Sequence, residues 1–145
     1  MLVTFCGHSQ VSNSDAVAGT LKAVITDLIA EGATEFYLGG YGEFDFMAAH
    51  AVREAKTAHP EIISMLVIPY MDRDFDPALY DNSVYPPLET VPLKFAISKR
   101  NEWMIDQADV VVSCITHGWG GAATTLRYAQ RKKKRKRTTM RTLTQ

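Results

Sequence analysis

The segment FYLGGYGEFD, residues 36–45, passes from strand-like to helical sequence within ten positions. Apolar and aromatic residues lead into a turn that is rich in glycine, and the chain then becomes acidic, with its apolar residues at helical spacing. This change predicts a strand, a tight turn and a helix that begins at the turn. The segments CGHS (6–9) and THGWGGAAT (116–124) also follow apolar runs, so each predicts the same kind of strand-to-helix turn.

Along the chain, segments whose apolar residues have the pattern of a strand alternate with segments whose apolar residues have helical spacing. Apolar runs predict strands over residues 2–6, 35–40, 62–70 and 109–116. Apolar stripes predict helices from an N-cap at Ser12 or Ser14 to near Gly32, from the glycine turn to just before Pro60, over 93–108 and over 120–132. Because parallel strands need crossover helices, this order predicts an α/β fold, a Rossmann-like three-layer sandwich with a mostly parallel central sheet of four to five strands.

The composition is that of a globular protein with one main domain. The chain has 145 residues, of which 46% are hydrophobic and 22% are charged, so it can bury a core without disulfides or metal ions. No apolar run approaches the roughly 20 residues of a membrane helix, and the N-terminus lacks the features of a secretory signal. We therefore expect a cytoplasmic protein with no membrane contact, in which Cys6 and Cys114 are buried, reduced thiols.

The net charge of zero hides two parts of opposite charge. Residues 1–126 hold all 16 acidic residues and seven basic ones, which gives −9, whereas residues 127–145 hold nine basic residues and no acidic one. We predict a Rossmann-like domain over 1–131 and a basic C-terminal tail over 132–145.

Two interpretations of this tail are open. The seven consecutive bases at 131–137 can bind nucleic acid through their charge. Alternatively, the tail is an altered terminus that replaces a last strand, because no aromatic residues or nucleic-acid motif accompany the charge. The segment TTMRTLT (138–144) can still pair as an edge strand.

The three glycine-rich turns predict a ligand site. In an open parallel sheet, ligands bind outside the carboxyl ends of the strands, where these turns fall. Glycine lets a phosphate approach the backbone N–H groups at a helix start, and the helix dipole favours the anion. The alternative is that the glycines only form tight turns. The residues of these turns that we expect to contact a nucleotide-like ligand are Gly7, His8, Gly39, Gly40, Gly42, His117, Gly118, Gly120 and Gly121.

The turns match neither of the two standard phosphate motifs. They lack the G-x-G-x-x-G spacing of dinucleotide-binding proteins and the G-x-x-x-x-G-K-[ST] of a P-loop. Hydride transfer and ATP hydrolysis through these motifs are therefore not expected, and no cofactor is predicted.

Five segments resemble a known family. VTFCGH (3–8), FYLGGYGEFD, YPPLE (85–89), FAISKRNEWMIDQADVVV (95–112) and THGWGGAATTLRYA (116–129) are similar to the YpsA-like branch of the SLOG superfamily, over residues 1 to about 131. That superfamily unites Rossmann-like proteins, among them the LONELY GUY phosphoribohydrolases and the DNA-processing protein Smf/DprA. The resemblance implies a nucleotide-related ligand and a possible homodimer.

The resemblance also implies roles for individual residues. Lys99, Arg100, Asn101 and Met104 occupy the stretch that carries an arginine-lysine pair and a methionine in the phosphoribohydrolases. Arg100 and Asn101 are thereby expected at the ligand, and Arg100 suits a bidentate phosphate contact. The alternative for Arg100 is an exposed residue on a helix.

The glutamate that helps to cleave the N-glycosidic bond in those enzymes is missing. Its position falls on Thr124 or Thr125, and a hydroxyl cannot act as the carboxylate. Whether the protein is an enzyme is therefore left open. Glu43 or Asp45, beside the glycine turn, can replace the missing acid, with Asp45 the better placed, or they can simply complement the helix dipole. Thr124 remains a candidate ligand contact.

Two cysteine–histidine pairs and a long loop have more than one interpretation. Cys6 with His8 and Cys114 with His117 supply the ligand types of a zinc site, but the spacing favours core cysteines and ligand-contacting histidines, so no metal is predicted. The loop 71–92 suits a lid or a partner surface. The aromatic residues that can stack on a base, or pack instead, are Tyr80, Tyr85 and Trp119.

Three functions are compatible with these residues. The first is binding or sensing of a nucleotide or nucleotide-derived small molecule at the glycine turns. The second is hydrolysis of a nucleotide N-glycosidic bond, and the third is a DprA-like association with nucleic acid.

Overall fold

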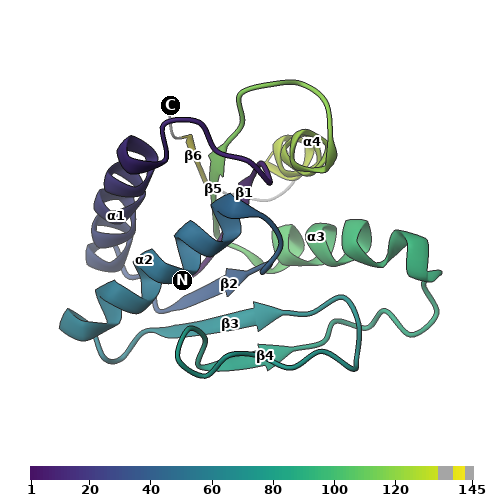
Figure 1. Ribbon diagram of the computed structural model, residues 1–145, viewed down its shortest axis with the longest axis horizontal. Coiled ribbons are helices and arrows are strands. Elements are labelled where there is room, and N and C mark those ends of the chain that lie inside the picture. Colours follow the sequence, from purple (N-terminus) through teal and green to yellow (C-terminus); the bar gives the residue numbers. More distant parts are fainter. Residues whose placement is uncertain (134–138, 143–145) are drawn as a thin grey trace.

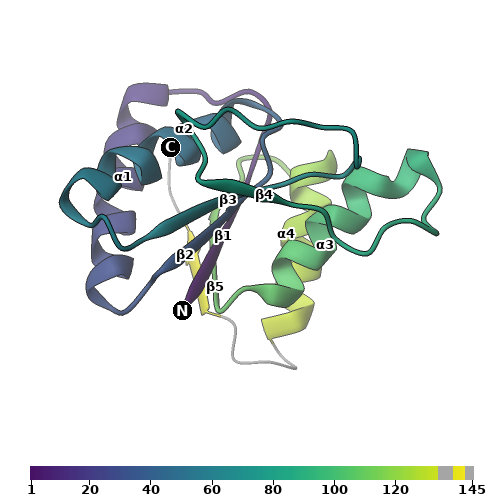
Figure 2. The same cartoon turned by 90° about the horizontal axis from the view of Figure 1, so that it is seen from below.

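The computed structural model describes residues 1–133 and 139–142 as a parallel sheet between two layers of helices (Figure 1). The strands are β1 (Leu2–Gly7), β2 (Glu35–Leu38), β3 (Ile63–Val67), β4 (Asn82–Val84), β5 (Val110–Cys114) and β6 (Thr139–Thr142). The helices are α1 (Ser14–Ala30), α2 (Glu43–Ala58), α3 (Ala96–Gln107), which follows the 3₁₀ turn η1 (Leu93–Phe95), and α4 (Gly121–Lys133). Helices α1 and α2 cover one face of the sheet, and α3 and α4 cover the other (Figure 2).

The predicted fold class is confirmed. All strand pairs are parallel, and the order is β4-β3-β2-β1-β5-β6 across the described residues. The sheet is wider than the four to five strands expected. The predicted edge strand over 138–144 is confirmed for β6, which pairs with β5, and the remaining positions of that segment lie outside the described residues.

Strand β4 lies inside the segment predicted as the loop 71–92, and ion pairs of the residue before it help to hold it. Asp81, the residue before it, accepts a hydrogen bond from the backbone N–H of Ser64 at 2.8 Å. It also pairs with Arg53 at 3.2 Å and Lys56 at 2.7 Å, both on α2. These contacts hold the loop against α2 and β3.

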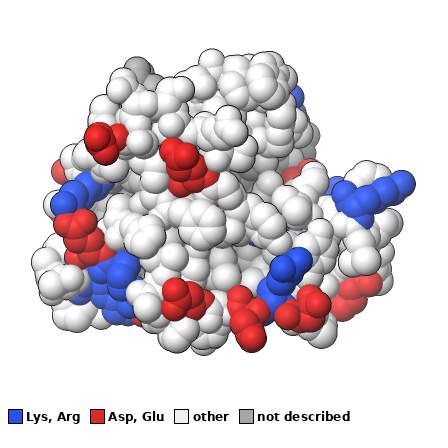
Figure 3. Space-filling model, viewed as in Figure 1, with Lys and Arg blue, Asp and Glu red and all other residues white. Residues whose placement is uncertain are grey.

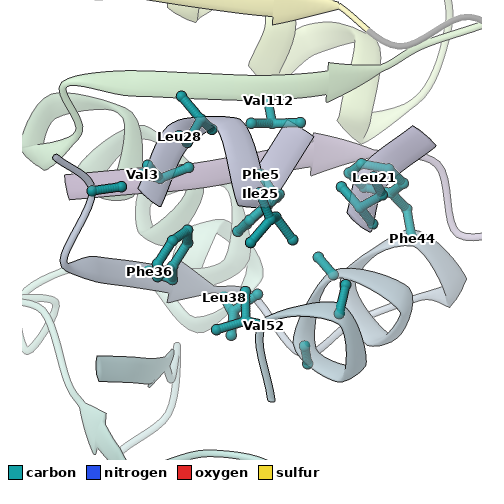
Figure 4. Close-up of a cluster of buried hydrophobic side chains, with 14 of the residues drawn as sticks. Val3, Phe5, Leu21, Ile25, Leu28, Phe36, Leu38, Phe44, Val52 and Val112 are labelled. Carbon is teal, nitrogen blue, oxygen red and sulfur yellow. The ribbon is translucent and has the colours of Figure 1, made fainter. Parts of the chain in front are cut away.

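One large apolar cluster fixes α1 and α2 on the sheet (Figure 4). The α1 residues that it buries are Val17, Leu21, Ile25 and Leu28. Their spacing of three or four residues gives the single apolar stripe expected of a helix on a sheet. The N-cap prediction was wrong: the residue before α1 is Asn13, in a left-handed conformation with φ 57°, and no side chain caps the helix. Asparagine tolerates this conformation better than most residues do.

Candidate functional site

The strand order creates a crevice at the centre of the sheet. From β1 the chain moves to one side, through β2 and β3 to β4, whereas β5 and β6 lie on the other side of β1. The turns that follow β1 and β5 therefore diverge at the carboxyl edge, which is where open α/β sheets bind ligands. A cavity of about 370 Å³ lies there, within the size range of small-molecule sites. Its lining residues are 5–10, Tyr41, Asp45, Ile97, Arg100, Asn101, Met104, Ile105, His117, Trp119, 120–122 and Thr125.

The glycines after β1 and β2 are required for packing. A Cβ atom on Gly7 would overlap the ring of Phe44, and one on Gly42 would lie 2.7 Å from the Cα atom of Ser9. The first N–H groups of α2 are also engaged, because Glu43 donates to the carbonyl of Ser9 at 2.9 Å. The turn at the start of α2 is therefore closed against the β1–α1 loop, and its first N–H groups already have protein acceptors.

Gly39 and Gly40 lie in a separate hollow of about 220 Å³, beside Leu66. A Cβ on Gly40 would lie 2.5 Å from Leu66 Cδ1, and φ at Gly40 is +70°, so a side chain is excluded there both by space and by backbone conformation. Together with Gly42, these glycines are not among the residues that line the cavity at the ends of β1 and β5. The tight-turn interpretation fits the β2–α2 turn better than the phosphate interpretation.

The turn between β5 and α4 is the open one. No heavy atom lies within 4 Å of a Cβ built on Gly118 or Gly121, and the nearest atom to one on Gly120 is His117 Cε1, at 4.0 Å. Gly120 and Gly121 line the cavity, and α4 begins at Gly121 with no acidic residue in its first turn. The first N–H groups of a helix lack intrahelical partners, so this helix start offers donors to an anion.

Arg100 is buried, and it joins the ends of two strands. Its side chain is 1% exposed, so the alternative of an exposed helix arginine is wrong. Nη1 donates to the carbonyls of Gly39 and Val67, each at 2.7 Å, and Nε donates to Asn101 Oδ1 at 2.9 Å. The guanidinium carbon also lies 5.2 Å from the ring centroid of Tyr41, a cation–π distance. Arg100 and Asn101 both line the cavity.

Asp45 places a carboxyl group in the same cavity, from the first turn of α2. Its Oδ2 atom accepts a hydrogen bond from the backbone N–H of Tyr41 at 3.1 Å. Burial raises the pKa of Asp45 from its ordinary value of 3.8 to about 6, against the opposing effects of the Tyr41 N–H and of Arg100. A carboxyl with a pKa near neutrality, beside a buried cation in a cavity, is the environment in which acid–base groups are found.

Three aromatic rings form a stack at the cavity. The ring centroids of His8 and His117 are 3.7 Å apart, and those of His117 and Trp119 are 3.8 Å apart. The backbone N–H of Thr116 donates to Nε2 of His8 at 3.0 Å, so the neutral His8 ring carries its proton on Nδ1. Burial, and secondarily His117, lowers the pKa of His8. The sequence predicted both histidines at the ligand, and the structure brings them together.

The remaining candidates divide between the cavity and other surfaces. Thr125 lines the cavity, whereas Thr124 is exposed and its hydroxyl donates to the Gly120 carbonyl at 3.1 Å. Glu43 lines a different groove, between α1 and α2. The Gly118 carbonyl accepts a hydrogen bond from Arg127 at 3.0 Å.

The cysteines are buried within the described fold, as expected. Both are free thiols, and burial raises the pKa of Cys6 to about 12, so its thiol stays protonated. The Cys6 thiol donates to the carbonyl of Ala122 at 3.2 Å. Within residues 1–133 and 139–142, no three His, Cys, Asp or Glu side chains are grouped as a metal would require.

Sequence reasoning missed several residues that line this cavity, among them Tyr41 and Ile97. Both line the cavity and are substantially exposed. The sequence could have indicated Tyr41, because it is an aromatic residue inside a glycine-rich turn, and such turns lie at the ligand-binding edge of the sheet. Nothing in the sequence distinguishes Ile97 from an apolar residue that packs a helix against the sheet.

On the face that carries α2, Lys, Arg, Asp and Glu side chains lie at the left, lower and right edges, and a further acidic side chain lies above the middle (Figure 3). The basic run at 131–137 lies mostly outside the described residues.

No protein-family model matches the chain, and no curated protein sequence matches it significantly. Within the part of the chain that the structure describes, no helix combines the length and apolar character needed to span a bilayer.

Proposed function

We propose that this protein binds a nucleotide or a nucleotide-derived small molecule in the cavity between β1 and β5. The observation that carries the proposal is the open glycine turn at the start of α4, which faces the cavity at the switch point of the sheet. Arg100 adds a buried cation at the same place. The resemblance to the SLOG superfamily supports the same class of ligand.

The proposal predicts that Gly121→Ala weakens ligand binding without weakening the fold. The methyl group meets no protein atom within 4 Å, so it would occupy space left for the ligand. We expect the dissociation constant for AMP, measured by calorimetric titration, to rise by about tenfold, which corresponds to about 1.4 kcal/mol. The unfolding midpoint should not fall, because alanine favours a helix more than glycine does.

Gly19→Ala is the matched control. Gly19 also lies in a helix with no atom within 4 Å of its Cβ position, but it lines the groove between α1 and α2 instead. This variant should bind AMP as the wild type does. Equal binding by Gly121→Ala and the wild type would contradict a ligand at the α4 turn, and failure of AMP, CMP and ribose 5-phosphate to bind at millimolar concentration would contradict the proposed function.

A second candidate function is hydrolysis of a nucleotide N-glycosidic bond, and Asp45 favours it. The carboxyl shares the cavity with the proposed ligand and has a pKa of about 6, so it can exchange a proton with a leaving base near neutral pH. The test is incubation of the wild-type protein with nucleoside 5′-monophosphates, followed by chromatography for the free base. If the protein binds the nucleotides but releases no base above background, the second function is contradicted and the binding or sensing function remains.

A further inference from the structure

The stack of His8, His117 and Trp119 ends at one side of the cavity in a ring that no other ring covers. Trp119 is 71% exposed although it is a large aromatic side chain, and it lines the cavity. One face of the indole packs on His117, with an angle of 18° between the planes. Among the described residues, no ring contact is found on its other face.

The stack gives Trp119 a fixed support. His117 lies between two rings, at an angle of 17° to His8, and His8 is in turn held by the Thr116 N–H. An exposed tryptophan in a glycine-rich turn would otherwise have freedom to rotate, and fixing it would cost entropy when a ligand binds. The two imidazoles therefore pre-organise the indole plane.

We propose that Trp119 is the platform on which a planar heteroaromatic ring of the ligand stacks. This inference rests on the proposed function. It specifies that the base contributes to the affinity, in addition to the sugar phosphate. Trp119 is two residues before Gly121, so the platform lies close along the chain to the helix start proposed for the anion. A nucleoside monophosphate carries both groups in one molecule.

The other aromatic candidates do not share this arrangement. Tyr80 is 4% exposed and packs in the core, and Tyr85 lines a separate hollow beside the loop at 69–73. Tyr41 lines the cavity, but the guanidinium of Arg100 lies over its ring. His117 contributes a second feature, because its Nδ1 atom is buried and has no hydrogen-bond partner in the described structure. The residue itself lines the cavity.

The experiment compares two probes, AMP and ribose 5-phosphate, in the wild type, Trp119→Ala and Trp119→Phe. Replacing a stacking aromatic side chain by alanine typically lowers the affinity for the base by roughly 5- to 150-fold. We expect Trp119→Ala to weaken AMP binding by such a factor and to leave ribose 5-phosphate binding within about twofold. Trp119→Phe, which keeps an aromatic face, should recover most of the AMP affinity.

Tryptophan fluorescence provides a second readout. The protein has two tryptophans, and Trp103 stacks on Tyr37 away from the cavity, with ring centroids 5.6 Å apart. In a Trp103→Phe variant, AMP should change the emission of Trp119 and ribose 5-phosphate should not. Circular dichroism of each variant checks that the fold is retained, as the exposure of Trp119 leads us to expect.

The outcomes separate this inference from the proposed function. One outcome is that the wild type binds both probes while Trp119→Ala has the same ratio of AMP affinity to ribose 5-phosphate affinity as the wild type. In that case Trp119 is not the stacking platform, and the proposed binding function stands. If the wild type binds neither probe nor CMP, both are wrong. A loss of ribose 5-phosphate and AMP affinity in equal measure would show a general disturbance of the turn and would also overturn the platform.

Discussion

Replacement of Arg100 by methionine is expected to lower the free energy of unfolding by about 3 to 5 kcal/mol, as removal of one member of a buried polar network usually does. Methionine fills much of the volume but cannot donate to the carbonyls of Gly39, which follows β2, and Val67, which ends β3. Burial lowers the pKa of Arg100 and Asp45 opposes that effect, so the charge itself is costly. Removing the buried charge offsets part of the lost stability, but the carbonyl oxygens of Gly39 and Val67 are left without a hydrogen-bond donor.

Urea denaturation of the variant at pH 7 measures this change. Arg127→Met is the matched control, because Arg127 also donates to a backbone carbonyl, that of Gly118 at 3.0 Å, but from an exposed position. It should cost less than about 1 kcal/mol. Arg100→Lys keeps a donor but loses the planar guanidinium, and should fall between the two.

An Arg100→Met protein as stable as the wild type would contradict the structural role. In that case the cation would be retained for the ligand alone, and the same variant would lose AMP binding while it keeps its stability. The two roles are therefore distinguishable with one variant and two measurements.

The alternation of apolar periods in the sequence predicted the architecture well. Strands at 2–6 and 109–116 and the helices between them depend on runs of buried residues, and such runs are a local property of the chain. The sequence did not predict the short strand β4, because its residues are NSV and the ion pairs of Asp81 with α2 contribute to its position. Long-range charge contacts of this kind leave no periodic pattern.

The site was harder to predict, because glycine has the same appearance in the sequence whatever surrounds it. Gly7 and Gly42 make room for neighbouring protein atoms, whereas Gly121 faces open space. What distinguishes them is the position of Phe44 and Ser9, which only the folded chain defines. The choice of Arg100 depended on the resemblance, and its burial depends on where the ends of β2 and β3 meet α3.

Asp45→Asn is expected to stabilise the protein at neutral pH. The folded carboxyl has a pKa of about 6 instead of 3.8, so between these values the folded state binds more protons than the unfolded state does. The free energy of unfolding therefore falls as the pH rises from about 4 to about 6, and the ionised group remains a burden above that range. Asparagine keeps an oxygen for the Tyr41 N–H and avoids the charge.

The gain should depend on pH in a defined way. At pH 8 we expect Asp45→Asn to raise the free energy of unfolding by about 2 kcal/mol, because a pKa difference of one corresponds to about 1.4 kcal/mol and relaxation of the protein reduces the full effect. At pH 4, where the carboxyl is already protonated in the folded protein, the gain should be no more than about 0.5 kcal/mol. If Asp45 also acts as the acid of an N-glycosidase, release of base from nucleoside monophosphates should fall by about 100-fold or more in the same variant.

Glu43→Gln is the control, since Glu43 lies in the same helical turn but is exposed and lines another groove. Loss of its charge removes a favourable interaction with the helix dipole, so stability should fall by up to about 1 kcal/mol, a change of opposite sign. A decrease in stability of Asp45→Asn at pH 8 would mean that the ionised carboxylate is a net stabilising partner of Arg100. Asp45 would then be part of the structural network at the strand ends. The argument for its function is that the acid is retained at a cost in stability, and that argument would no longer hold.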